Sequence, residues 1–231
     1  MPTAPRYKYL DALITAFVVI LLVSNLVAQK VCQIGPFSVS GAILLFPITY
    51  IFGDVFTEVY GFAASRRAIW LGFFGTALLY VMGAIVIALP AAPGWKNQQA
   101  FATVFAFIPR ILAASLIAFW AGEFANSYTM ARLKLLTRGR WLWTRTVSST
   151  IIGQAVDTII VVVLTFAGNY PASKLARIIV TSYCLKVAYE ILATPLTYLV
   201  VNFLKRAENS DPYDAHTNFN PFTFFGANSQ S

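Results

Sequence analysis

The sequence predicts an all-α membrane protein with six transmembrane helices. Its 231 residues are 58% hydrophobic and 11% charged, and the mean hydropathy is +0.68, whereas an ordinary soluble domain carries about 25% charged residues. Apolar runs long enough to cross about 30 Å of hydrocarbon recur along the chain. Turn-forming stretches such as "QIGPF", "LPAAPGW" and "GNYPAS" separate these runs. Together these observations predict a polytopic helical bundle.

The breaks define six spans that form a single transmembrane domain over residues 1–206. The expected spans are residues 10–29, 38–63, 67–90, 103–131, 143–167 and 174–204. Residues 207–231 are polar and rich in Asn and Ser, a composition that predicts a disordered tail.

The cations that flank the spans predict the orientation in the membrane. One side carries Arg6, Lys8, Arg66, Arg67, Arg132, Lys134, Arg138, Arg140, Arg145, Lys205 and Arg206, and the other carries Lys30, Lys96, Lys174 and Arg177. The excess on the first side places both termini in the cytoplasm. Six spans fit this result, because an even number returns the chain to its starting side. Despite a net charge of +8, no basic track interleaved with aromatic residues is present, so nucleic acid is not an expected partner.

Most of the acidic residues are predicted to lie inside the membrane. Five of the nine fall in apolar spans, namely Asp54, Glu58, Glu123, Asp157 and Glu190. An Asp at the centre of a membrane helix costs about 2.5 to 3.5 kcal/mol even on lenient scales, so fold stability alone does not explain five of them. Because such side chains must turn away from lipid, we expect the second, fourth, fifth and sixth spans to enclose a polar cavity near the middle of the membrane.

Helical spacing groups the candidate binding residues into pairs that share a helix face. The pairs are Asp54 with Glu58, Glu123 with Asn126, Gln154 with Asp157, and Lys186 with Glu190. Like charges four residues apart repel, so Asp54 and Glu58 require either a cation between them or a proton on one of them. Lys186 and Glu190, in contrast, can neutralise each other as a structural pair.

Four further residues are weaker candidates for ligand binding. Asn25 lies near the outer end of the first span, and Tyr50 and Tyr183 can stack on a flat ligand. Arg110 can contribute a positive charge, but it can equally extend its side chain to the outer membrane boundary.

Small residues recur every fourth position in the fourth span, at Ala114, Ala118 and Gly122. This spacing is typical of a surface on which two membrane helices pack closely.

Several blocks of the sequence also resemble a known family. "SNLVAQK", "ILLFPITYIFGDVFTEVYGF", "GEFANSY", "GQAVDT" and "LKVAYEILATPLTY" are similar to blocks of the queuosine precursor transporters, a branch of the vitamin uptake transporters, and they occur in the same order across all six spans. The resemblance implies an inner-membrane importer of 7-cyano- and 7-aminomethyl-7-deazaguanine, precursors of a modified tRNA base, with queuine as a further ligand of some members.

The chemistry of a deazaguanine suits the candidate residues. A carboxylate accepts the two adjacent N–H groups of a guanine-like edge, and a second carboxylate suits a cationic aminomethyl group. The ligand's carbonyl needs a donor, for which Gln154, Asn126 and Lys186 are candidates. The residues alone do not assign one acid to each role.

Alternative functions remain open at this stage. The chain can be the substrate-binding membrane subunit of a vitamin-type importer that needs a separate ATPase, since no nucleotide-binding motif is present. Alternatively, an acid inside the membrane can carry a proton together with the substrate and so couple transport to a proton gradient. An intramembrane aspartyl enzyme would use Asp54 with Asp157, whereas His216 in the tail excludes a buried site built on histidine. A ligand-free scaffold and an ion channel are further alternatives. We expect no enzyme activity, cofactor or metal, and a homodimer is left open.

Overall fold

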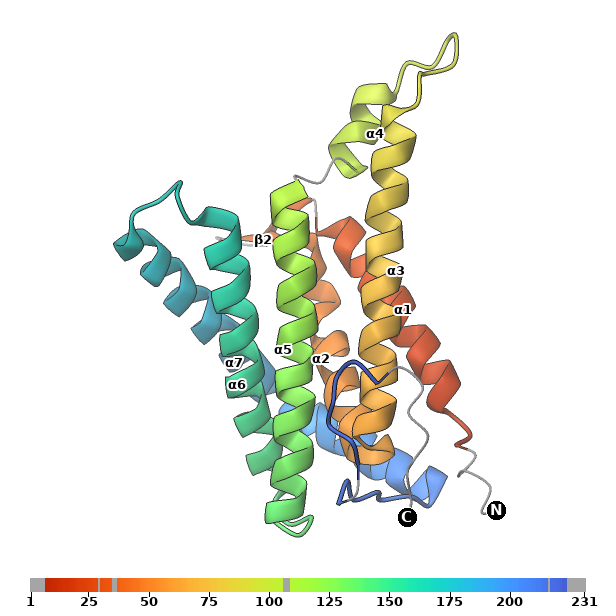
Figure 1. The fold of residues 1–231 in the computed structure, drawn as a ribbon, viewed down its shortest axis with the longest axis vertical. Helices are drawn as coiled ribbons and strands as arrows, with labels where there is room; N and C mark the ends of the chain where they lie inside the picture. Colours follow the sequence, from red (N-terminus) through yellow and green to blue (C-terminus); the bar gives the residue numbers. More distant parts are fainter. Residues whose placement is uncertain (1–6, 29, 35–36, 106–108, 216, 224–231) are drawn as a thin grey trace.

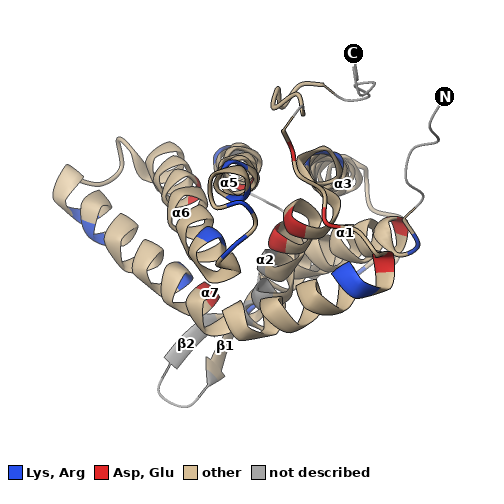
Figure 2. Cartoon of the chain, turned by 90° about the horizontal axis from the view of Figure 1, so that it is seen from below, with Lys and Arg blue, Asp and Glu red and all other residues tan. Residues whose placement is uncertain are grey.

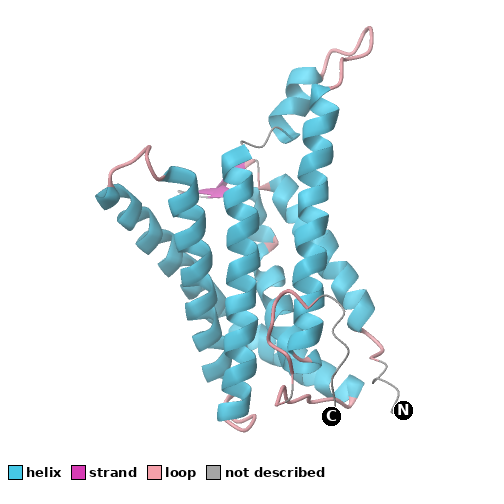
Figure 3. Cartoon of the chain, viewed as in Figure 1, coloured by secondary structure: helices cyan, strands magenta, loops and turns pink. Residues whose placement is uncertain are grey.

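The computed structural model describes residues 7–28, 30–34, 37–105, 109–215 and 217–223. Within them the chain is almost entirely helical (Figures 1 and 3). The α-helices are α1 (Leu10–Val27), α2 (Phe46–Val55), α3 (Phe62–Ala88), α4 (Gln98–Phe105), α5 (Pro109–Leu136), α6 (Leu142–Phe166) and α7 (Ala172–Glu208). A short antiparallel hairpin, β1 (Val31–Ile34) and β2 (Phe37–Ser40), follows α1.

Five segments among the described residues are long and apolar enough to cross a membrane. They are α1, α3, α6, α7 and the segment that contains α5, with mean hydropathies between 1.5 and 2.4 over their best windows. These helices confirm the all-α class and indicate a multi-pass membrane protein.

The second expected span, residues 38–63, differs from the prediction. After β2 and a 3₁₀ turn (Gly41–Leu44), α2 contributes 10 residues and a π-helical turn, η2 (Phe56–Tyr60), contributes 5. Gly61 then adopts φ of +83°, a conformation that favours glycine, and this ends the helix before α3 begins at Phe62. The helical part therefore covers only about 22 Å at 1.5 Å per residue, less than a bilayer core.

Helices α5 and α6 pack at very short range. A Cβ on Gly122 would lie 2.8 Å from Cβ of Asp157, and a Cβ on Gly153 would lie 2.8 Å from Cβ of Asn126. Ala114 and Ala118 are also buried, which confirms the small-residue contact surface predicted for the fourth span. The close contact matters because it sets Asp157 against Gly122 and Asn126 against Gly153, and both polar side chains line the cavity described below.

The start of α1 and the end of α7 lie at the same end of the molecule. The carboxylate of Glu208 accepts the backbone N–H groups of Lys8 and Tyr9, both at 2.8 Å. In the view from below this end, coloured segments of the ribbon mark Lys, Arg, Asp and Glu positions on α2, α5, α6 and α7 (Figure 2).

The described part of the C-terminal tail packs on this end of the molecule. Both carboxylate oxygens of Asp214 accept the N–H of Phe62, at 3.2 and 3.1 Å, and so cap α3. Arg66 donates to the carbonyl oxygen of Asn218 at 2.7 Å, and Trp70 donates to that of Pro221 at 2.7 Å. The prediction of disorder from residue 207 onward thus differs from the structure, because side chains of α3 bind the tail's backbone. Residues 216 and 224–231 lie outside the described residues.

Candidate functional site

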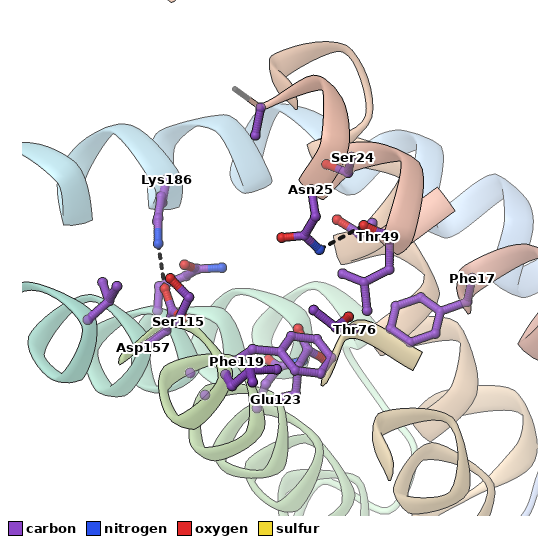
Figure 4. Close-up of a pocket in the computed structure, with 18 of the residues that line it drawn as sticks. Phe17, Ser24, Asn25, Thr49, Thr76, Ser115, Phe119, Glu123, Asp157 and Lys186 are labelled. Carbon is purple, nitrogen blue, oxygen red and sulfur yellow. Dashed lines mark hydrogen bonds and ion pairs between the residues drawn. The ribbon is translucent and has the colours of Figure 1, made fainter. Parts of the chain in front are cut away.

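A cavity of about 250 Å³ lies among the helices. Side chains from α1, α2, α3, α5, α6 and α7 line it (Figure 4). We predicted that α2, α5, α6 and α7 share this polar interior. Thr49 is the lining residue of α2 among the side chains that the structure describes, and α1 and α3 line the cavity as well.

Seven of the twelve predicted binding residues line this cavity. They are Asn25, Glu123, Asn126, Gln154, Asp157, Lys186 and Glu190. The others, Asp54, Glu58, Arg110 and Tyr183, lie elsewhere, and the side chain of Tyr50 is outside the described part of the structure.

An ion pair crosses the cavity between two helices. Nζ of Lys186 on α7 contacts a carboxylate oxygen of Asp157 on α6 (Figure 4). The sequence offered Glu190 as a structural partner for Lys186. The structure instead pairs the lysine with Asp157, because hydroxyl and amide groups of α6 take up the carboxylate of Glu190.

Glu190 is buried at the cavity wall and holds two side chains of α6. Its Oε1 accepts the hydroxyl of Thr150 at 2.7 Å, and its Oε2 accepts Nε2 of Gln154 at 3.3 Å. The other end of that amide, Oε1 of Gln154, is buried and has no hydrogen-bond partner among the described residues. An unpaired buried acceptor costs about 1 to 3 kcal/mol, and a bound donor would remove this cost.

Glu123 is a cavity carboxylate without a side-chain partner among the described residues. Among the described residues no side chain forms an ion pair or a hydrogen bond with it. It lies against α2, since a Cβ on Gly53 would come within 3.0 Å of its Oε2. A free carboxylate in a cavity lined by Phe17 and Phe119 can accept hydrogen bonds from a ligand.

Asp54 is buried, with 1% of its surface exposed, and is not a lining residue. Its Oδ1 accepts Nδ2 of Asn126 at 3.4 Å. Oδ1 of Asn126 in turn has no hydrogen-bond partner among the described residues. Asp54 therefore contacts the cavity wall from behind.

Glu58 is fully buried in a cluster of charges away from the cavity. Its Oε1 lies 2.8 Å from Nη2 of Arg145, 3.4 Å from Nζ of Lys134 and 2.5 Å from Nζ of Lys205. Asp211 of the tail contacts both lysines, at 2.6 and 2.7 Å. Three cations thus compensate the charge of Glu58, so the repulsion expected between Asp54 and Glu58 at i and i+4 is offset.

Asp54 and Glu58 have different partners. Glu58 lies in η2, where the helix changes from an α-helical to a π-helical turn. Asp54 contacts Asn126 of α5, whereas Glu58 contacts Arg145 of α6 and Lys205 of α7. The sequence predicted that Asp54 and Glu58 both line the binding cavity. In the structure neither of them is a lining residue.

Arg110 stabilises the end of a neighbouring helix. Its Nε and Nη2 donate to the carbonyl oxygens of Leu164 and Ala167, both at 2.6 Å. These carbonyls belong to the last turn of α6, where backbone acceptors lack intrahelical donors. Tyr183 is half-buried on α7 and does not line the cavity.

Sequence reasoning missed the polar contribution of α3. Thr76 and Tyr80 line the cavity, and the hydroxyl of Tyr80 donates to Oδ1 of Asn25 at 2.9 Å. The hydroxyl of Thr76 is buried without a partner among the described residues. Their spacing of four residues, which places both on one helix face, was the sequence signal that could have identified this polar contribution. Within the described residues no group of acids, histidines or cysteines could hold a metal ion.

Comparisons with known proteins agree on one family. Residues 40–200 match the family model described as "Putative vitamin uptake transporter". The chain is 29% identical over 189 residues to the "Probable queuosine precursor transporter" of Bacillus subtilis (strain 168), covering 81% of this chain and 82% of that protein. It is 25% identical over 203 residues to the "Queuosine precursor transporter" of Escherichia coli (strain K12), covering 86% and 89%. No solved structure was found to match the chain.

Proposed function

Because the chain belongs to the vitamin uptake transporter family, we propose that it imports queuosine precursors across the inner membrane and binds them in the cavity described above. The substrates of this proposal are 7-cyano- and 7-aminomethyl-7-deazaguanine, with queuine as a further ligand. The names of the two relatives support the substrate class. The observation that carries the site is the cation-free carboxylate of Glu123 in the cavity.

The hydrogen-bonding groups of a deazaguanine complement those of the cavity. The base offers N–H donors on its pyrrole ring, its lactam and its amino group. The cavity offers acceptors, namely the carboxylate of Glu123 and the amide oxygens of Asn126 and Gln154. A carboxylate binds two adjacent N–H groups in a bidentate way, so Glu123 would hold the lactam and amino edge. The ring would stack on Phe17 or Phe119.

The charge of the cavity suits a cationic ligand. Glu123, Asp157 and Glu190 line it and Asp54 lies directly behind it, whereas Lys186 is the cation among the described lining residues. A bound ammonium group would offset this excess of acid, which favours the aminomethyl precursor over the cyano precursor. A proton carried by one of the acids would offset it in the same way, and we include this coupling in the proposal.

The proposal retains six membrane-crossing elements with both termini in the cytoplasm. The second element would be α2 with η2, which is shorter than a bilayer core. The bilayer is the surrounding partner, and a homodimer is compatible with this arrangement. Transport is favoured over an aspartyl enzyme because Asp54 and Asp157 contact different partners, Asn126 and Lys186.

Ligand-induced stabilisation of the purified protein tests the site. We expect 7-cyano- and 7-aminomethyl-7-deazaguanine to raise the melting temperature and guanine not to, since a ligand at a hundredfold excess over Kd stabilises by about 2.7 kcal/mol. Glu123→Gln should abolish the effect. Asp11→Asn is the matched control, because it removes an acid whose side chain is 81% exposed. If no deazaguanine stabilises the wild-type protein, the proposed site is wrong.

Uptake into proteoliposomes tests transport itself. Accumulation of 7-aminomethyl-7-deazaguanine without ATP, driven by an inward proton gradient, would support a self-sufficient carrier. Binding without uptake would instead point to a substrate-binding subunit that requires a separate ATPase.

A further inference from the structure

Two amides of the cavity wall are held in the same way. In each case a carboxylate accepts the amide nitrogen, and the amide oxygen is left buried without a partner among the described residues. The pairs are Asp54 with Asn126 and Glu190 with Gln154. Both amides are more than nine-tenths buried, at 8% and 7% exposure, and both line the cavity.

The carboxylate decides which end of each amide is available to a ligand. A carboxylate offers only acceptor atoms, whereas an amide has a donor end and an acceptor end. Turning the amide of Asn126 around would bring its oxygen against Oδ1 of Asp54, so the nitrogen stays bound and the oxygen remains as an acceptor. An Asn without this neighbour would present either end.

The position of Asn126 is also confined by packing. On one side, Gly53 and Asp54 of α2 lie against it, since a Cβ on Gly53 would come within 3.7 Å of Nδ2 of Asn126. On the other side, a Cβ on Gly153 of α6 would come within 2.8 Å of its Cβ. The side chain is therefore held between two helices, and the rotation of its amide is set by the hydrogen bond that it donates to Asp54.

We propose that Asp54 is a positioning residue, which does not touch the substrate but orients the amide of Asn126 so that its oxygen accepts an N–H group of the ligand. Glu190, which itself lines the cavity, orients the amide of Gln154 in the same way. The site thereby presents acceptors to a donor-rich heterocycle. This inference rests on the proposed function, because it names how that cavity recognises its ligand.

A double-mutant cycle separates an indirect role of Asp54 from a direct one. The dissociation constant of 7-cyano-7-deazaguanine is measured for the wild-type protein, Asp54→Asn, Asn126→Ala and the double variant. Asp54→Asn should weaken binding about tenfold, the loss expected for one hydrogen bond. In the Asn126→Ala background the same change should weaken binding less than about twofold, because the amide that Asp54 orients is gone.

A charge-conserving exchange provides the rescue. In Asp54→Asn with Asn126→Asp, the amide at position 54 donates to a carboxylate at position 126, whose second oxygen again serves the cavity as an acceptor. This variant should bind about tenfold more tightly than Asn126→Asp alone, in which two carboxylates face each other. The comparison also holds if Asp54→Asn alone does not fold. The melting temperature without ligand reports any purely structural effect.

The control cycle combines Asp54→Asn with Thr76→Val, a lining residue of α3 whose hydroxyl has no partner among the described residues. Here the two losses should add. Additive losses between Asp54 and Asn126, or no gain in the exchange variant, would overturn the positioning role while leaving the deazaguanine site intact. If the wild-type protein binds no deazaguanine, the proposed function fails and this inference falls with it.

Discussion

Replacing Glu58 by Gln should destabilise the protein more than any other single loss of an acid outside the cavity. The buried Oε1 of Glu58 contacts Arg145, Lys134 and Lys205, and Asp211 is the second acid of the cluster. Arg145 and Lys134 are 1% and 2% exposed, so water cannot replace the lost carboxylate. The cluster would retain three cations against one acid.

The size of the effect follows from the burial of the group. Removing one partner of a buried ion pair costs about 3 to 5 kcal/mol, because the remaining charge stays buried without compensation. In a chain of this length, each kcal/mol shifts the melting temperature by about 2 to 4 °C. We therefore expect Glu58→Gln to lower the melting temperature by at least about 6 °C.

The assay is thermal unfolding of the protein purified in detergent, and the matched control is Asp11→Asn. Asp11 pairs with Arg67 at 3.1 Å, but the two side chains are 81% and 58% exposed. Such a surface pair contributes about 0 to 1 kcal/mol. Adding Lys205→Met to Glu58→Gln should recover part of the stability by removing one uncompensated charge. A melting temperature for Glu58→Gln within about 2 °C of the control would refute the reasoning.

Three further predictions concern other parts of the structure. Gly153→Ala should weaken ligand binding at least tenfold, since the added Cβ would lie 2.8 Å from Cβ of Asn126 and displace that side chain. Titration calorimetry measures the affinity, and an unchanged affinity would contradict the close packing. Gly61→Ala should cost about 1 to 2 kcal/mol in unfolding free energy, because φ is +83° there; a neutral result would mean that the break between η2 and α3 relaxes. Partial burial raises the pKa of Asp211, but the hydrogen bonds and charges of Lys134 and of the neighbouring lysine on α7 outweigh it and lower the pKa below its usual value. The resulting stability is present above the unfolded pKa of about 3.9 and is lost as pH falls through the folded pKa. Asp211→Asn should therefore lower the melting temperature more at pH 6 than at pH 3, and an equal loss at both would argue against this charge effect.

The local composition of the sequence determined the class of the protein and the charged and amide residues of the cavity wall. Apolar runs of membrane length predicted long helices, because the bilayer requires about 20 apolar residues per crossing. The cost of burying polar groups in lipid then indicated that Glu123, Asn126, Gln154 and Asp157 face inward, and all four line the cavity. These inferences depend on spacing within one helix, which a sequence displays directly.

Only the tertiary structure decided the partner of each acid. The three cations around Glu58 are 76, 87 and 147 residues away in the chain, and the sequence showed them only as cations flanking the membrane. The change from an α-helical to a π-helical turn at Phe56 likewise has no signature in the spacing of the residues. Pairing between distant segments is set by how the helices pack together, and a pattern read along one helix does not contain that information.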